Sequence, residues 1–451
     1  MAALLRKVWE SVSRSSKATS ESSDRRVVVQ SSTGAFSHIP FDVFMHILQF
    51  LEPREVAKLS LVCKYWKFLV SDNQLWLYLL QKEQNQPGSW DSLVFAETHL
   101  QMGYPLLTFN DQMPQLSFMH IFGRRAKAPG AIIIDGGSGY CKYGWSKYDT
   151  TTGMSATFLE FGNIETPIYS RLRHFLATIY SRMHVKPSAQ PIVLSVPICH
   201  YDDNESAKAS RRQLKETIHS VLFDMNVPAV CAINQATLAL YAAKQTSGIV
   251  VNIGFHCTSI VPSKIFRERM QQQNMNFESL YTVRSLKENL CYVAADYEAE
   301  LSKDTRASFQ VASEGWFTLS RERFQTGEIL FQPRMAGVTM MGLHQAVAHC
   351  MDHCQSAAIT ADESWFKTVV LAGGSACLPG LAERLEKELH GLVCPSVANG
   401  IRVLPPPYGE KSAWFGAKII SNLSTFPGSW CMTKKQFRPK VRRNLMVTIF
   451  N

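Results

Sequence analysis

The sequence predicts a multidomain protein of mixed α+β and α/β class, in which a short all-helical unit precedes a larger two-lobed α/β domain. Between residues 36 and 80, apolar side chains recur at three and four positions, the period of an α-helix. From residue 131 onward, short apolar runs end in glycine turns at three separate places. A chain of 451 residues is long enough for roughly two to four folding units with their own cores.

Composition narrows the class of protein. The chain is 46% hydrophobic and 19% charged, as in ordinary globular proteins. It has no apolar run of about 18 residues and no long apolar segment near its start, so we expect neither a membrane span nor a secretory signal. The 11 cysteines are scattered without paired spacing, which favours reduced thiols in the nucleus or cytoplasm.

The net charge of +10 is concentrated at the two ends of the chain. Residues 1–30 hold six basic and three acidic side chains, and residues 432–451 hold six basic and none acidic. The basic tail, placed at 436–451, suits nuclear import, nucleic-acid contact or a solvated extension equally. Because the basic residues of this tail are not regularly interleaved with aromatic ones (Phe437 alone lies among them), we do not expect a nucleic-acid-binding protein.

One tight cluster of possible metal ligands occurs, formed by His349, Cys350, His353 and Cys354. On a helix these residues pair at four-residue spacing, and one helix cannot surround an ion by itself. We therefore expect a helix packed by one face into a core, without zinc.

The first folded unit is predicted to be helical. Residues 1–34 are rich in serine and basic residues and predict a disordered lead. Pro40 suits the first position of a helix that carries Val43, Ile47 and Leu51 on one face. Pro53 interrupts, and a second stripe of apolar residues runs to Val70. The pattern alone fits a partner-binding unit and a packed helical cap equally.

The residues themselves decide between these alternatives. IPFDVFMHILQFLEPREVAKLSLVCKYWKFLVSDNQLW, at 39–76, resembles an F-box, which we place at 35–82. The resemblance implies binding to the Skp-type adaptor of a cullin–RING ubiquitin ligase. The residues that it assigns to the contact are Pro40, Val43, Ile47, Leu51, Leu59, Cys63, Trp66, Leu75 and Trp76.

Residues 83–130 are expected to form a linker region, ending in RRAKAPG, and glycine turns follow it. They lie at 135–142, at 248–254 and at 368–375, each after an apolar strand. Glycines allow a tight turn to aim successive N–H groups inward, which makes a concave site for phosphate. Three such turns far apart in sequence favour a two-lobed domain that holds a nucleotide in its cleft.

The segment 131–435 resembles the actin and actin-related family, whose nucleotide fold is shared with sugar kinases and heat-shock ATPases. The similar stretches are IIIDGGSGYCKYG, INQATLALYAAKQTSGIVVNIG, VRSLKENLCYVAADYE, VLAGGSACLPGLAERL and PPPYGEKSAWFGAKIISNL. The resemblance implies a site for ATP or ADP with Mg²⁺, with Asp135 also serving the metal and Gln235 placed where the family positions water. The nucleotide-binding residues that it implies are Asp135, Gly137, Ser138, Gly139, Lys142, Gly254, Lys287, Glu288, Gly373 and Gly374.

Three departures from the family pattern argue against hydrolysis. Asn252 replaces a metal-organising aspartate, Phe255 a second aspartate and Ser259 a histidine. A serine hydroxyl does not take up a proton without a neighbouring base. We therefore expect no catalytic residues and no efficient ATP turnover.

The chain also looks shorter than the family at two places. The small outer lobe expected after Lys142 is largely missing, so no actin-like filament is expected. A strand hairpin is missing near 262–280, where a polar helix around Arg267 is expected instead. Such a loss suggests a splice variant or an imperfect gene model.

An F-box followed by an actin-like domain resembles a class of plant actin-related protein. It implies a non-catalytic substrate receptor of a Skp–cullin–F-box ubiquitin ligase, whose actin-like domain recruits an unidentified target or senses nucleotide. The alternatives are a nuclear actin-related scaffold without a ligase role and a weak ATPase switch. The expected location is the nucleus, including the nucleolus, or the cytoplasm.

Overall fold

The fold is described from a computed structural model for residues 39–84, 90–101, 103, 117–127, 130–137, 139–156, 166–196, 205–254, 280–312, 314–356 and 365–438. The chain divides into two compact units, Met1–Asn85 and Gln86–Asn451, which are treated separately below. The predicted disordered lead at 1–34, the polar helix around Arg267 and most of the basic tail lie outside the described residues. No helix in the described part is long and apolar enough to cross a membrane.

The first unit is helical, as predicted. Its helices are α2 (Phe41–Phe50), α3 (Pro53–Leu59), α4 (Lys64–Val70) and α5 (Asn73–Gln84). Their inward faces bury Phe44, Leu48 and Val56 in a small core. The Trp66 ring packs edge-on against Phe44, with centroids 5.0 Å apart. The Trp76 indole N–H donates to the Val70 carbonyl at 2.5 Å, which ties α5 to the end of α4.

Details of the helix boundaries differ from the sequence-based expectation. Pro40 precedes α2 as its cap, and Pro53 begins α3 rather than only interrupting the chain. The single stripe expected up to Val70 divides into α3 and α4. The N–H of Leu61 bonds three residues back to the Lys58 carbonyl, and Cys63 then adopts an extended backbone (φ −160°). This tight turn ends α3 before α4 begins.

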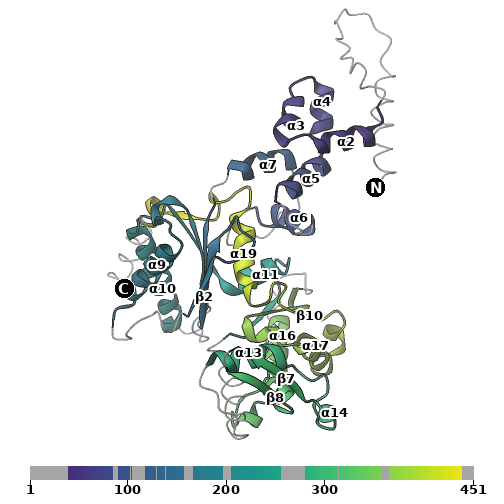
Figure 1. Ribbon diagram of the computed structural model, residues 1–451, viewed down its shortest axis with the longest axis vertical. Coiled ribbons are helices and arrows are strands. Elements are labelled where there is room, and N and C mark those ends of the chain that lie inside the picture. The colour runs from purple at the N-terminus through teal and green to yellow at the C-terminus, as the bar shows by residue number, and fades with distance from the viewer. Residues whose placement is uncertain are drawn as a thin grey trace, which may run out of the picture. The chain divides into compact units, whose positions relative to one another are not determined.

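The second unit contains a six-stranded sheet in the order β11-β5-β4-β1-β2-β3. These strands are β1 (Ile132–Gly136), β2 (Tyr140–Trp145), β3 (Gly153–Ala156), β4 (Ile192–Val196), β5 (Ala229–Asn234) and β11 (Met432–Thr433). Alternate residues of β1 face opposite sides: Ile132 packs with α9 (Ile168–Arg182) and α10 (Glu205–Asp224), and Ile133 packs with α11 (Gln235–Ala242) and α19 (Ser412–Ser421). Figure 1 shows these helix pairs covering the two faces of the sheet.

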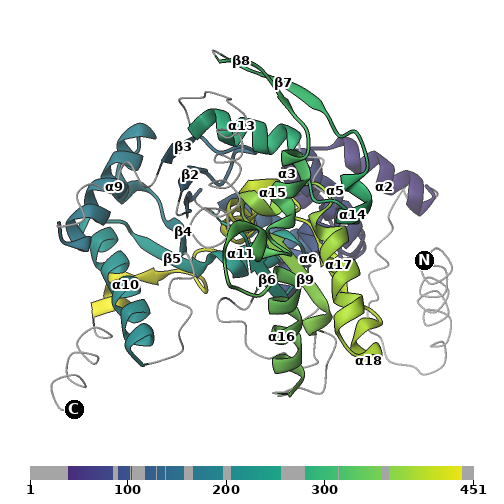
Figure 2. The same cartoon turned by 90° about the horizontal axis from the view of Figure 1, so that it is seen from below.

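A second, parallel sheet has the order β10-β9-β6, formed by β6 (Ile249–Asn252), β9 (Thr368–Ala372) and β10 (Arg402–Leu404). Its core includes residues of α13 (Leu280–Leu290), α16 (Leu343–Ser356) and α17 (Leu381–Leu392). The hairpin of β7 (Ala307–Val311) and β8 (Gly315–Leu319) extends from this lobe (Figure 2). Shorter elements are α14 (Tyr297–Leu301), α15 (Glu322–Glu328), α18 (Pro395–Ala398), η2 (Pro187–Ala189), η3 (Pro333–Ala336), η4 (Trp365–Lys367), η5 (Gly374–Cys377) and η6 (Gly409–Lys411).

The Cys/His cluster lies on α16, as the spacing predicts. This helix buries Val347, Ala348 and Met351, whereas His349 and Cys350 on the other side are exposed. In the described part of the chain, no group of three or more His, Cys, Asp or Glu side chains is arranged to hold a metal ion.

The region predicted as a linker, 83–130, contains two helices, α6 (Trp90–His99) and α7 (Phe118–Lys127). Glu97 of α6 is fully buried. Its carboxylate accepts hydrogen bonds from the N–H (3.0 Å) and hydroxyl (2.8 Å) of Ser424, and lies 3.6 Å from Arg125 of α7. The expectation of a linker is therefore wrong for these helices, because a buried carboxylate joins them to the segment that follows α19.

We expect Glu97→Ala to lower the free energy of unfolding of the larger unit by about 3 kcal/mol, because it leaves Arg125 and the Ser424 N–H without their carboxylate. Chemical denaturation followed by fluorescence measures the change. The control is Glu298→Ala on α14, where the glutamate is exposed and stability should change little. Equal stability of the two variants would show that Glu97 does not hold α6 and α7.

Candidate functional site

Three strand ends meet in the larger unit, and each is followed by a glycine turn. At Gly373 (φ +92°) an added Cβ would lie 2.5 Å from the Ile253 carbonyl oxygen, so only glycine fits where β9 passes the end of β6. At Gly137 an added Cβ would lie 2.5 Å from the Tyr140 carbonyl oxygen. These two glycines are required by close backbone packing.

Gly254 and Gly374 differ from those two glycines because space is open beside them. A Cβ at Gly254 would meet no atom within 4 Å, and one at Gly374 would meet only the Glu410 Cβ, at 3.9 Å. A backbone without side chains that faces open space is what close approach of a phosphate needs.

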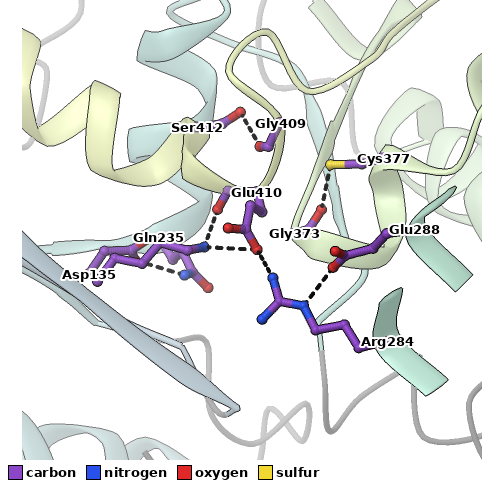
Figure 3. A network of polar contacts seen from close by, with 10 residues as sticks. Asp135, Gln235, Arg284, Glu288, Gly373, Cys377, Gly409, Glu410 and Ser412 are labelled. Carbon is purple, nitrogen blue, oxygen red and sulfur yellow. Dashed lines mark hydrogen bonds and ion pairs between the residues drawn. The ribbon is translucent and has the colours of Figure 1, made fainter. Parts of the chain in front are cut away.

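Asp135, near the end of β1 in the six-stranded sheet, begins a chain of hydrogen bonds that reaches Asn252, at the end of β6 in the parallel sheet. Its Oδ1 accepts from the Ser195 hydroxyl and from the Gln235 amide, the latter at 2.9 Å. The Gln235 side-chain oxygen in turn accepts from the Asn252 amide at 2.9 Å. Figure 3 shows Gln235 directed toward Asp135. The amide of Asn252 therefore holds Gln235 by its oxygen, which is the atom that would accept a hydrogen bond from water.

Three cations approach the same place. Lys142 lies opposite Asp135 in the register of β1 and β2, and its ammonium donates to the Glu410 carbonyl. Arg284 of α13 bonds the carboxylates of Glu410 at 3.0 Å and Glu288 at 2.7 Å. Positive charge beside glycine turns is the chemistry that binds polyphosphate.

Lys287 is the third cation and lies one helical turn from Arg284 on α13. Its ammonium donates to the Ser375 hydroxyl at 3.1 Å, next to Gly374. Burial lowers the pKa of the Lys287 ammonium from its ordinary value, and the carboxylate of Glu288 opposes that shift. The side chain is thus held beside the third glycine turn.

The predicted residues fall into three groups of contacts: Asp135 is linked through Gln235 to Asn252, Lys142 is linked through Glu410 to Arg284 and Glu288, and Lys287 bonds Ser375. Ser138, Phe255 and Ser259 lie outside the described residues. Sequence reasoning did not find the roles of Ser195, Arg284 and Glu410. Arg284 could have been found, because it precedes Lys287 by three residues and so shares its helix face.

These residues fit a phosphate better than a divalent ion. Asp135, the predicted metal residue, already accepts two hydrogen bonds at Oδ1. Asn252, which replaces an expected carboxylate, is neutral, whereas hard divalent cations prefer charged oxygen ligands.

The helical unit presents a second candidate site. Of the residues predicted to contact an adaptor, Pro40, Val43 and Ile47 are exposed, and Leu51, Leu59, Cys63 and Trp66 are half-buried. Leu75 and Trp76 are buried, so we reassign them to the core. Exposed apolar residues that the sequence analysis did not single out are Phe41, Phe50, Leu61, Val62 and Phe68.

Comparison with known families identifies both units. The F-box-like family model matches residues 36–82. The Actin family model matches residues 175–264 and 263–441, more than half of the chain, in two segments that meet at 263–264.

Curated relatives match nearly the whole chain. "Actin-related protein 8" of Arabidopsis thaliana is 59% identical over 470 positions, covering 97% of this chain and 99% of the relative. "Actin-related protein 8" of Oryza sativa subsp. indica is 57% identical, covering 98% of each. "Actin-like protein 7B" of Macaca fascicularis is 24% identical and covers 70% of this chain and 88% of the relative. The chain therefore belongs to the actin family, as a plant actin-related protein that carries an F-box-like domain.

Proposed function

We propose that the protein is a non-catalytic substrate receptor of a Skp–cullin–F-box ubiquitin ligase, in which the actin-like domain recruits the target. The observation that carries the proposal is the apolar surface of the F-box-like unit. Seven large apolar side chains there are at least 43% exposed: Phe41, Val43, Ile47, Phe50, Leu61, Val62 and Phe68. So many exposed apolar residues in one small domain favour a protein-binding surface.

Affinity purification of the full chain from plant cells, after proteasome inhibition, tests this proposal. We expect a Skp-type adaptor and a cullin among the recovered proteins, together with ubiquitylated targets. Recovery of the intact chain with other partners but without an adaptor would favour the alternative, an actin-related scaffold that has no ligase role.

We further propose that the cleft of the actin-like domain binds the phosphates of ATP or ADP as a ligand rather than as a substrate. Lys142, Arg284 and Lys287 supply the positive charge, and the missing side chains of Gly254 and Gly374 leave space for the phosphates. Mg²⁺ bound with the nucleotide would neutralise part of the phosphate charge, and Asp135 would have only its Oδ2 to offer the ion, because Oδ1 already accepts two hydrogen bonds. The state of this cleft would then report nucleotide to the surface that binds the target.

ATP is expected to raise the melting temperature of the protein, because a ligand that binds only the folded state stabilises it. Gly254→Ala and Gly374→Ala should remove most of that shift, since each methyl group fills space that the phosphates need and touches little of the protein itself. Gly391→Ala on α17 is the matched control, because a Cβ there also meets nothing within 4 Å. Gly137→Val is less suitable because it would collide with the Tyr140 backbone. Identical shifts of the melting temperature in Gly254→Ala, Gly374→Ala and Gly391→Ala would place the nucleotide elsewhere.

We also propose that the chain lacks a hairpin of the actin fold near 262–280. The two segments that match the family model meet at 263–264, inside this region. The alignment to the Arabidopsis relative spans 470 positions, more than the 451 residues of this chain, as expected when the relative contains residues that this chain lacks.

A further inference from the structure

Glu410 lies where the cations of the two lobes meet. It belongs to η6, just before α19. In Figure 3 its carboxylate lies between Arg284 and the pair formed by Asp135 and Gln235. Its Oε2 is 3.0 Å from a guanidinium nitrogen of Arg284, on α13, and 3.9 Å from the ammonium of Lys142, on β2. The Glu410 main-chain carbonyl also accepts from Lys142. One residue therefore binds a cation from each lobe.

The turn that carries Glu410 is held in place. The Ser412 hydroxyl donates to the Gly409 carbonyl at 2.8 Å, and the rings of Tyr408 and Phe415 stack with centroids 4.1 Å apart. A Cβ added at Gly374 would lie 3.9 Å from the Glu410 Cβ, so Glu410 borders the open space beside Gly374. The carboxylate is thus fixed beside the turn that we assign to phosphate.

The ion pairs that Glu410 forms with Lys142 and Arg284 are partly shielded from solvent. The side chains of Lys142, Arg284 and Glu410 are 10%, 26% and 32% exposed. Charges in such places interact more strongly than charges on an open surface, where screening by water reduces an ion pair to little.

We propose that Glu410 is an internal anion that sets the affinity of the cleft by competing with phosphate for Lys142 and Arg284. The inference rests on the proposed nucleotide site and deepens it. A polyphosphate that reaches these cations must either displace the Glu410 carboxylate or lie beside it. Losing the ion pairs in the first case, and repulsion between like charges in the second, lower the affinity for polyphosphate. Where phosphate displaces the carboxylate, binding breaks an ionic link between the lobes, and the contacts of Glu410 then couple phosphate binding to lobe geometry.

The experiment compares Glu410→Gln with wild type, using inorganic tripolyphosphate as the probe in calorimetry at low salt. Glutamine keeps the size of the side chain and the carbonyl contact with Lys142 but removes the charge. Arg284 retains Glu288 as a partner. We expect about tenfold tighter binding, with a steeper loss of affinity as salt is raised. In Glu410→Gln/Arg284→Gln most of the gain should be lost, because only Lys142 remains of the two cations that Glu410 contacts.

Glu388→Gln is the matched control. Glu388 is 31% exposed and pairs with Arg384 at 2.7 Å, and Arg384 also retains a second carboxylate, Glu328. This control should bind tripolyphosphate as wild type does. Equal affinity of Glu410→Gln and wild type would overturn the role of Glu410 while leaving the phosphate site intact. If no variant and no wild-type protein bound the probe, the phosphate site itself would be wrong, and the role of Glu410 with it.

Discussion

Replacing Val43 and Ile47 by aspartate is expected to weaken binding of a Skp-type adaptor at least about a hundredfold. Both side chains are nearly half exposed on α2, at 47% and 44%, so charge there should leave the helical core intact. Apolar anchors at the centre of an interface typically contribute about 2 kcal/mol or more each, and a buried charge adds a desolvation cost. Calorimetry with purified full-length chain and adaptor measures the loss.

The control for this prediction is Trp316→Asp on β8, an apolar side chain that is 69% exposed but lies in the actin-like unit. It should bind the adaptor as wild type does. Trp66, which packs against Phe44, is unsuitable for such a test because charge there would disturb the core. Unchanged affinity of the Val43/Ile47 variant, with its helical content preserved, would rule out this face as the adaptor site.

Asn252→Asp is expected to make nucleotide binding depend on Mg²⁺. The substitution removes the N–H that donates to Gln235 and adds a carboxylate to the hydrogen-bonded chain that ends at Asp135. Because divalent cations prefer charged oxygen ligands, Mg²⁺ should increase the affinity of the variant for ATP about tenfold. Wild type should respond less than about threefold, a difference that calorimetry with and without a chelator resolves.

Asn289→Asp on α13 serves as the control for added charge, since Asn289 also donates through its amide, to the Ser285 carbonyl, but is exposed. Its response to Mg²⁺ should equal that of wild type. An equally strong Mg²⁺ response in wild type and Asn252→Asp would show that the neutral residue at 252 does not weaken the metal site. ATP turnover by wild type that is lost in Asp135→Ala would favour the ATPase-switch alternative.

The fold was predictable wherever local pattern decides structure. The strands β1, β6 and β9 are apolar runs that lead into glycine, as the sequence predicted. Strand β2, which includes Lys142, was not predicted, because 135–142 was assigned to a glycine turn. The break between α3 and α4 was not predictable in this way. Leu61 and Val62 continue an apolar run, so the period alone joins the two helices.

Long-range contacts account for what the sequence did not reveal. Glu410 meets Lys142 across 268 residues, and Glu97 meets Ser424 across 327. Glu410 lies within the family-like stretch PPPYGEKSAWFGAKIISNL, but nothing local in that stretch indicates its partners. RRAKAPG suggested a linker because it is basic, whereas the residues that α7 buries, Phe118 and Ile121, precede it. Such roles arise from packing in the folded domain rather than from local spacing.

We propose that this chain joins a ubiquitin ligase to a target through its F-box-like unit. Size-exclusion chromatography with light scattering, on an equimolar mixture of full-length chain, Skp-type adaptor and cullin, tests it most directly. We predict one complex containing each protein once, which is lost when Val43 and Ile47 are replaced by aspartate. Elution of the folded chain apart from an intact adaptor–cullin complex, at micromolar concentrations, would contradict the claim.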